Sequence, residues 1–310
     1  MNTIKIFAPA TIGNIGPGFD VLGLAIKGLG DTIEAREISG NKLIIENIQN
    51  SDHDISTNPK KNTAGIAAQE ALNLLKIKKG VALNISKGLP SGSGLGSSAA
   101  SSVAGAYAIN HLFGNSLNKQ QLLQASMAGE YKVSGGYFAD NVAPAIYGGA
   151  TLTCSLNPLV IAHLGTISEL ILVIAIPKIQ ILTKDSREIL PKSVELSDCI
   201  HNMANTASIT AAFCNDDYAM LKNSLIDFII EPARSKLIFG FPDVKEAALD
   251  AGADGMTISG SGPTVFAITN SLETATKIEK AMINAFNNNN IECRTFISSP
   301  CTDGAKLLKD

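Results

Sequence analysis

The sequence has no tryptophan, and aromatic residues make up only 5% of its 310 positions. Surfaces that stack bases or sugars usually need such rings, so the composition argues against them. Lys and Arg (25) do not exceed Asp and Glu (28), and no basic excess indicates a nucleic-acid partner. No stretch approaches the roughly 20 apolar residues that span a bilayer. The N-terminal residues also lack a charged region followed by an apolar stretch, so we expect a cytoplasmic protein with no membrane partner.

Metal-site and redox-motif spacings are also missing. The five cysteines are an odd number and no two of them form a CxxC pair, while the four histidines are scattered. Zinc sites and thiol redox sites need closely spaced ligands or thiols. We therefore expect free thiols in a reducing compartment and no catalysis by a Cys–His pair.

The periodicity of apolar residues predicts a mixed α and β chain. In the first half it indicates helices and one strand, at Thr63–Lys76, Val81–Ile85 (the strand), Ser97–Leu112 and roughly Lys119–Lys132. In the second half it indicates a buried strand, helical segments, two strands, a helix and a last strand, at Leu170–Ile176, Ile200–Cys214, Asp217–Ile229, Val244–Ala251, Gly255–Ser259, Thr264–Thr269, Leu272–Asn288 and Glu292–Ser298. This order favours an α+β sandwich. A loop-like stretch near Pro158 divides the chain into expected domains 1–160 and 161–310.

The most informative segment is a glycine-rich loop, Gly88–Gly96, followed at once by the helix predicted from Ser97. Three of its glycines alternate, so backbone N–H groups can approach a ligand, and we expect Gly94 to leave space for phosphates. The helix directs its positive N-terminal end at the loop. Ser97 and Ser98 add hydroxyls, one of which could reach a phosphate-bound Mg²⁺. The segment predicts a phosphate site, and a plain glycine–serine loop is the less favoured alternative.

This loop does not fit the common nucleotide motifs. A Walker loop needs Gly-Lys, and the sequence contains no such dipeptide. A dinucleotide fingerprint needs a third glycine, where Ser97 stands, and an acid about 20 residues later, yet no acid occurs between Gly96 and Glu130. Protein-kinase signatures are absent as well. A nicotinamide-dependent oxidoreductase is therefore disfavoured.

Three further segments combine glycines with polar side chains. Pro9–Asp20 is a tight turn flanked by Asn14 and Asp20, and Gly136–Pro144 follows Glu130, a candidate Mg²⁺ ligand. Ile258–Thr264 is a glycine-rich turn between two predicted strands, which could bring backbone donors to a ligand. Each segment alone is also compatible with an ordinary turn, so only their combination carries weight.

Together the four segments resemble the GHMP kinases. Pro90–Ala100 is similar to the ATP-binding motif of that family, and Ser259–Pro263 to its C-terminal glycine motif. The members that phosphorylate L-homoserine are the most similar, at Pro9–Asp20, Ala139–Ala145, Ile230–Arg234 and Gly252–Thr264. The resemblance runs from Pro9 to about Ile268 and implies a two-domain α+β fold. Its N-terminal α/β domain would be S5-domain-2-like, and its C-terminal α+β domain ferredoxin-like.

The resemblance also implies a role for each matching residue. ATP would be bound by Pro90, Ser91, Gly92, Ser93, Gly94, Leu95, Gly96, Ser97, Ser98, Ala99, Ala100 and Ser101, and Mg²⁺ by Ser98 and Glu130. L-Homoserine would be bound by Asn14, Asp20, Asp140, Asn141, Arg187, Arg234 and Gly260. The catalytic residues would be Asn141, Thr183 and Arg187, with Thr183 near the transferred phosphoryl group. The implied reaction is ATP-dependent phosphorylation of the homoserine hydroxyl, a step of threonine biosynthesis, and we expect a homodimer.

The substrate's own chemistry agrees with these roles. Two arginines, Arg187 and Arg234, can bind a carboxylate in bidentate fashion, and Asp20 can accept from an ammonium. Asn141 stands near the position where mevalonate-phosphorylating members carry an Asp base, but a loose phosphoryl-transfer transition state makes little demand for such a base. Phe138 departs from the family, since homoserine-phosphorylating members often have His there. Another GHMP kinase, for example one acting on mevalonate, and a non-catalytic ligand sensor on the same fold remain alternatives.

Overall fold

The computed structural model describes residues 3–52, 54–134, 136, 138–181 and 183–309, and its first part is built on a large sheet. Within these residues the sheet has seven strands, β1 (Thr3–Gly13), β2 (Leu22–Ile38), β3 (Leu43–Gln49), β4 (Gly80–Ser86), β5 (Ala150–Leu156), β6 (Leu159–Gly165) and β11 (Lys306–Leu307). Their order is β11-β1-β2-β4-β3, and β5 pairs with both β2 and β6. The pairings are antiparallel except for the parallel pair β3–β4.

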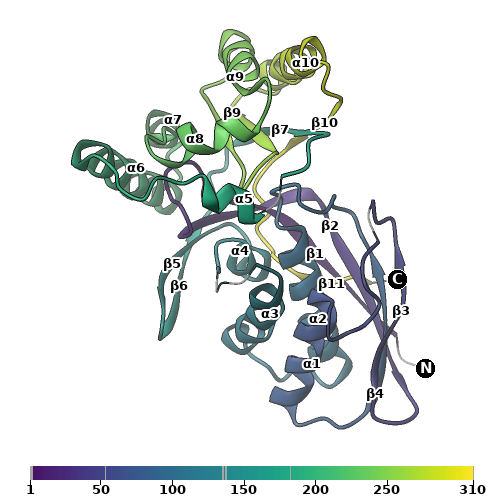
Figure 1. Cartoon of the computed structure of the whole chain (residues 1–310). Helices are drawn as coiled ribbons and strands as arrows, with labels where there is room; N and C mark the ends of the chain where they lie inside the picture. Colours follow the sequence, from purple (N-terminus) through teal and green to yellow (C-terminus); the bar gives the residue numbers. More distant parts are fainter. Residues whose placement is uncertain (1–2, 53, 135, 137, 182, 310) are drawn as a thin grey trace.

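Helices α1 (Thr63–Leu75), α2 (Ser97–Leu112), α3 (Lys119–Ser134) and α4 (Val142–Tyr147) lie together on one side of this sheet (Figure 1). The central one, α2, is buried along almost its whole length. Its alanines, serines and glycine allow a close approach to α1, because a Cβ at Gly105 would overlap the Ala64 carbonyl oxygen. The small side chains of α2 therefore fix the helix whose N-terminus follows the glycine-rich loop.

The second part is built on a smaller antiparallel sheet, which contains β7 (Ile171–Pro177), β8 (Gly255–Ile258), β9 (Val265–Thr269) and β10 (Cys293–Ser298). Its order is β10-β7-β9-β8. Between β7 and β8 the chain forms α5 (Thr183–Glu188), α6 (Leu196–Asn215), α7 (Tyr218–Ser224), α8 (Ile230–Arg234), a 3₁₀ turn (Ser235–Leu237) and α9 (Phe241–Asp250). Helix α10 (Leu272–Asn288) connects β9 to β10. A strand order of fourth, first, third and second is that of a ferredoxin-like unit, so the predicted C-terminal fold is confirmed.

Most of the elements predicted from periodicity are present with small boundary shifts, but the helix over Asp217–Ile229 was predicted too long. Helix α7 ends at Ser224, and a separate helix, α8, starts at Ile230. The break occurs because the Asp227 carboxylate accepts hydrogen bonds from the backbone N–H groups of Ile229, Ile230 and Glu231. These N–H groups therefore lie at the start of a new helix, α8, and do not extend α7.

The expected domain boundary at residue 160 stays a prediction, and the strand pairing shows which elements lie around it. Residue 160 lies inside the β5–β6 hairpin of the large sheet, and β6 continues to Gly165. After β10 the chain also returns to this sheet, where β11 pairs with β1 and the Lys27 N–H donates to the Ser299 carbonyl at 2.9 Å. The C-terminal end therefore lies beside the N-terminal part (Figure 1).

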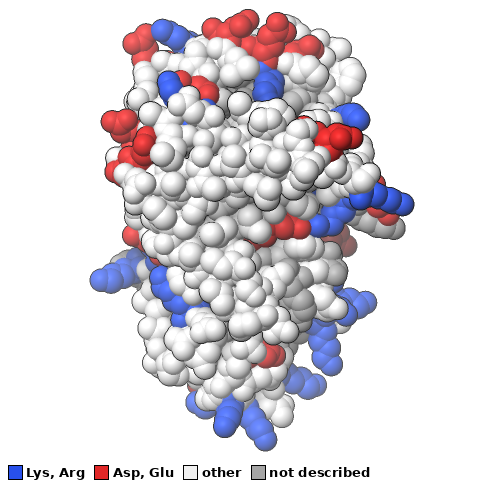
Figure 2. All heavy atoms as spheres, turned by 90° about the vertical axis from the view of Figure 1, so that its left-hand side faces the viewer, with Lys and Arg blue, Asp and Glu red and all other residues white. Residues whose placement is uncertain are grey.

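The distribution of charged side chains on the surface agrees with the absence of a basic excess in the sequence. On the face in Figure 2, Lys and Arg side chains are scattered and form no continuous basic band. Within the ranges described above, no helix is both long and apolar enough to cross a membrane. All five cysteines are free.

Candidate active site

A cavity of about 390 Å³ brings most of the predicted site residues together. Its lining includes Asn14, Asp20, Lys87, Ser91, Gly92, Ser93, Gly94, Gly96, Ser97, Ser98, Ser101, Glu130, Phe138, Asp140, Asn141, Arg187, Arg234, Gly260 and Ser261. Four residues of the predicted ATP motif are not in the lining: Pro90, Leu95, Ala99 and Ala100. Leu95, Ala99 and Ala100 are buried in the core, where they anchor the loop and the helix. The side chain of Thr183 lies outside the described residues.

Hydrogen bonds to its main-chain carbonyls hold the glycine-rich loop against the end of β1 and the turn between β8 and β9. The Thr11 N–H donates to the Leu95 carbonyl at 3.1 Å, and the Thr264 N–H donates to the Ser93 carbonyl at 3.2 Å. The Ser259 hydroxyl donates to the Gly94 carbonyl at 2.7 Å. The loops that carry three of the four predicted segments therefore form one wall of the cavity.

The structure corrects the expected reason for Gly94. Its φ is +82°, but a Cβ there would overlap the Ser259 carbonyl oxygen and lie 2.9 Å from the Gly262 carbonyl oxygen. Gly94 therefore makes room for the neighbouring loop and not for a ligand. Gly92, at φ +66°, is the open position, because its Cβ would meet only the Ile181 carbonyl oxygen at 3.8 Å.

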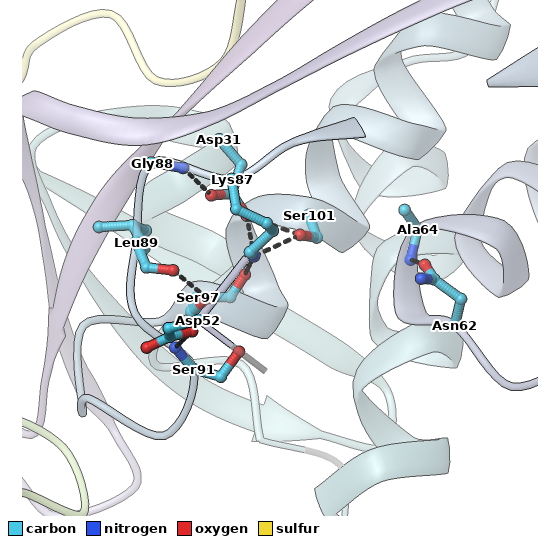
Figure 3. A network of polar contacts seen from close by, with 10 residues as sticks. All are labelled: Asp31, Asp52, Asn62, Ala64, Lys87, Gly88, Leu89, Ser91, Ser97 and Ser101. Atoms are coloured by element: carbon cyan, nitrogen blue, oxygen red, sulfur yellow. Dashed lines mark hydrogen bonds and ion pairs between the residues drawn. The ribbon is translucent and has the colours of Figure 1, made fainter. Parts of the chain in front are cut away.

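A buried ion pair lies beneath the loop, and sequence reasoning missed it (Figure 3). Lys87, directly after β4, pairs with Asp31 on β2, and its Nζ also donates to the Ser97 carbonyl at 3.1 Å and the Ser101 hydroxyl at 2.8 Å. Asp31 accepts a further hydrogen bond from the Ser101 hydroxyl at 2.6 Å. Its other oxygen accepts from the Gly88 N–H at 3.0 Å. The three ammonium protons of Lys87 thus have three acceptors, and the pair joins the start of the loop to the first turns of α2.

Ser98 and Glu130, the two predicted Mg²⁺ ligands, both line the cavity. Burial raises the pKa of Glu130, while a hydrogen bond with Ser98 and the charge of Lys87 act in the opposite direction. Within the described part of the chain, no group of three or more His, Cys, Asp or Glu side chains could hold a metal ion. A carboxylate and a hydroxyl with room for phosphate oxygens and water fit Mg²⁺, which usually takes few protein ligands.

At the other end of the cavity, Arg187 and Asp20 form a bidentate ion pair. Arg187 Nη2 lies 2.8 Å from Asp20 Oδ1, and Nη1 lies 3.1 Å from Oδ2. The Arg187 Cζ lies 3.8 Å from the centre of the Phe138 ring, so the aromatic replacement provides a cation–π contact. In this structure, the groups assigned to the ammonium and the carboxylate of the substrate therefore bind each other.

Arg234 is the second cation of this end and is 3% exposed. Its Nη1 donates to the Gly260 carbonyl at 2.7 Å and its Nε to the Ser186 carbonyl at 3.2 Å. Burial, together with the charge of Arg187, lowers the pKa of Arg234 to about 10, so the guanidinium remains charged at neutral pH. These two bonds fix the side chain in place at the edge of the cavity.

Asp140 and Asn141 lie between the two ends. The Asn141 amide donates to Asp140 Oδ2 at 3.1 Å and accepts from the Thr11 hydroxyl at 2.9 Å. Burial, followed by the charge of Asp20, raises the pKa of Asp140 to about 7. Asp140 is therefore a carboxyl group whose charge changes near neutral pH, inside the cavity.

Sequence reasoning also missed an apolar end of the cavity, lined by Ile48, Ile55 and Ile85 near the phosphate loop. Isolated isoleucines on strands and connections carry no motif. The sequence did not single out Asp31 and Lys87 either, because β2 carries several other charged residues and Lys87 comes directly after β4.

Comparisons with known proteins agree with this geometry. Residues 62–149 match the family described as "GHMP kinases N terminal domain" and residues 210–288 the one described as "GHMP kinases C terminal". A homoserine kinase of Chlorobium phaeobacteroides is 38% identical over 99% of this chain and 100% of its own length. One from Methanococcus maripaludis is 40% identical over 86% of this chain and 88% of its own.

Solved structures give the same answer. The crystal structure of homoserine kinase from Cytophaga hutchinsonii is 42% identical and superposes with a TM-score of 0.95 over 99% of this chain and 98% of that one. A mevalonate kinase at 18% identity and a TM-score of 0.69 shares the fold. The chain therefore belongs to the GHMP kinase family, in its homoserine kinase branch.

Proposed function

We propose that the protein transfers the γ-phosphoryl group of ATP to the side-chain hydroxyl of L-homoserine, producing O-phospho-L-homoserine for threonine biosynthesis. The observation that carries the proposal is a single cavity with a phosphate loop at one end and a cluster of two arginines and two aspartates at the other. Such a cavity suits a triphosphate and a small zwitterionic alcohol held together.

The nucleotide end is supported by the loop and α2. The backbone N–H groups of the loop and the N-terminus of a 16-residue helix favour the anionic phosphates. The apolar surface of Ile48, Ile55 and Ile85 suits the nucleobase. ATP binding through Ser91–Ser98 therefore follows as part of the proposal.

Ser98 and Glu130 would hold Mg²⁺, and the metal would supply neutralisation of charge on the phosphates. Glu130 is the only acidic residue between Gly96 and Asp140 in the sequence. Its buried carboxyl gains a compensating cation in such a complex, and this removes the cost that raises its pKa. Ser98 would keep that carboxylate oriented through their hydrogen bond.

The acceptor end would bind the amino acid through Arg187 and Arg234 at the carboxylate and Asp20 at the ammonium. Asn14, Asn141 and Gly260 would align the hydroxyl with the phosphate loop, and Thr183 remains a proposed catalytic residue. Transfer through a loose transition state depends mainly on positioning and charge neutralisation. Asp140, with a pKa of about 7, is available in the same cavity to take up the hydroxyl proton late in transfer.

We also propose that the protein is a cytoplasmic homodimer. Helix α6 exposes Leu196, Ile200 and Met203, and Phe228 and Ile226 are exposed after it. Figure 2 looks at the side on which α6 lies and shows a broad area with few charged residues. Exposed apolar groups of this kind favour association. Light scattering of the wild type and of Ile200→Glu tests the dimer, and an unchanged monomer in both would contradict it.

A coupled assay of ADP release, run with a panel of alcohols as phosphoryl acceptors, tests the function directly. The panel contains L-homoserine, mevalonate, galactose, L-serine and L-threonine. We expect the highest kcat/KM with L-homoserine, and detection of O-phosphohomoserine by mass spectrometry. Faster turnover of mevalonate would indicate the other kinase, and no turnover of any alcohol with intact ATP binding would indicate a ligand sensor.

A further inference from the structure

The acceptor end of the cavity contains an ion pair that belongs to the protein itself. Asp20 lies in the turn between β1 and β2, whereas Arg187 lies on α5. Two parallel hydrogen bonds of 2.8 and 3.1 Å join their side chains across 167 positions of sequence. Asp20 was assigned to the ammonium of the substrate and Arg187 to its carboxylate. In this structure the two side chains bind each other instead.

The pair is supported on several sides. The Asp20 N–H donates to Asn14 Oδ1 at 3.1 Å, and the Asn14 amide donates to the Gly260 carbonyl at 3.0 Å. The Arg187 guanidinium contacts two rings, with its Cζ 3.8 Å from the Phe138 ring centre and 5.5 Å from that of Phe19. Within the described residues, Arg187 Nε is buried and has no hydrogen-bond partner. The Nε–H of Arg187 thus has no acceptor among the described residues, while Nη1 and Nη2 both donate to Asp20.

We propose that the Asp20–Arg187 pair is an exchangeable lock that selects zwitterionic alcohols, an inference that rests on the proposed amino-acid acceptor. When the substrate binds, its carboxylate replaces Asp20 on Arg187, and its ammonium replaces Arg187 on Asp20. Two ion pairs replace one, and neither protein charge is left without a partner.

The charges around the pair explain why a ligand with only one charge is disfavoured. Asp140 and Arg234 are close enough to affect the same groups, and the four side chains together carry no net charge when ionised. An alcohol with a carboxylate but no ammonium would take Arg187 and leave Asp20 facing Asp140 with its partner lost. The less exposed a charge is, the more it costs to leave that charge without a partner, and the Asp20 and Arg187 side chains are 29% and 31% exposed.

The lock makes a prediction that separate, open contacts do not make. If Asp20 only bound the ammonium, replacing it would leave an ammonium-free substrate unaffected. If Asp20 instead competes for Arg187, its neutral replacement must improve the binding of that substrate. Asn is the suitable replacement, because Asp20 has φ +59° and Asn tolerates the left-handed region better than other side chains.

The test compares wild type and Asp20→Asn with two ligands, L-homoserine and 4-hydroxybutyrate, which lacks only the amino group. Both kcat/KM and the affinity measured by calorimetry are determined. For Asp20→Asn we expect at least a tenfold loss of kcat/KM with L-homoserine and at least about a fivefold gain in affinity for 4-hydroxybutyrate. Asp243→Asn, on an exposed part of α9, serves as the matched control and should change neither value.

An unchanged or lower affinity of Asp20→Asn for 4-hydroxybutyrate overturns the lock, and so does binding too weak to measure in both proteins. Equal affinity of the wild type for the two ligands also overturns it. Calorimetry reports on the lock without turnover. If the wild type releases no ADP with L-homoserine, only the proposed function is contradicted. If the wild type phosphorylates L-homoserine but Asp20→Asn does not bind 4-hydroxybutyrate more tightly, only the lock is contradicted.

Discussion

The buried Lys87–Asp31 pair allows a quantitative prediction, because its members are 4% and 0% exposed at the side chain. Lys87→Met keeps most of the apolar length of the side chain but removes the ammonium. Asp31 then keeps the Gly88 N–H and the Ser101 hydroxyl and loses its only ion-pair partner in the described structure. Removing one member of a buried pair costs about 3–5 kcal/mol.

That cost should be visible as a lower melting temperature. At about 2–4 °C per kcal/mol, the loss corresponds to a fall of roughly 6–20 °C in thermal unfolding followed by circular dichroism. The double variant Lys87→Met/Asp31→Asn removes the uncompensated charge, so we expect it to recover part of that fall. The exposed pair Lys79–Glu37 provides the control, since Lys79→Met should cost less than about 1 kcal/mol.

Activity should change along with stability. Lys87 Nζ holds the Ser97 carbonyl and the Ser101 hydroxyl at the first turns of α2, so its loss should shift the phosphate loop. We expect KM for ATP to rise at least about tenfold and KM for L-homoserine to change much less, measured at a temperature where the variant is folded. A melting temperature within 2 °C of wild type, with the double variant no more stable than the single one, would refute this reasoning.

The remaining predictions concern three single positions. Glu130→Gln should lower kcat at least ~10²-fold at saturating Mg²⁺, because the site loses its charged ligand; near-normal turnover would remove Glu130 from the site, and exposed Glu273→Gln is the control. Gly92→Ala should raise KM for ATP at least about tenfold, because the added Cβ would stand at the open position of the loop. Gly40→Ala is the control: its backbone strain is similar (φ +92° against +66°), but it lies away from the cavity and should leave KM for ATP unchanged. Equal KM values for ATP in the two variants would exclude the loop from ATP binding. Asp140 has a folded pKa of about 7 against 3.8 for the free group, so it reduces the stability of the wild type as pH rises from about 4 to 7. The melting temperature of Asp140→Asn relative to wild type should therefore increase from pH 5 to pH 8, and a constant difference would contradict the assigned pKa.

Local pattern determined the parts of this protein that depend on neighbouring residues. The helices at Ser97–Leu112 and Leu272–Asn288 were predicted with the observed bounds, because periodicity, capping and propensity act over a few turns. The phosphate loop was evident for the same reason. Its glycines and the helix after it are adjacent in the chain, and the four motif segments were specific enough to indicate the GHMP kinase family.

Long-range contacts decided the rest. The strands β1 and β2 of the large sheet were not predicted, because neither alternates over its whole length: the last six positions of β1 are all buried, and β2 alternates only in its second half. The helix predicted over Asp217–Ile229 stops early, where Asn202 of α6 donates to Asp227 and accepts from the Phe228 N–H, across 25 and 26 positions of sequence.

The site shows the same division between residue type and contact. The resemblance to the GHMP kinases implied that Asp20 and Arg187 are charged groups of one pocket, but only the tertiary structure shows that they bind each other across 167 positions. Likewise, Gly94 was identified as a glycine that must lack a Cβ, yet the atoms that require this belong to the loop 259–262. Residue chemistry is local, whereas the partner that each group meets is set by how the two sheets bring separate loops together.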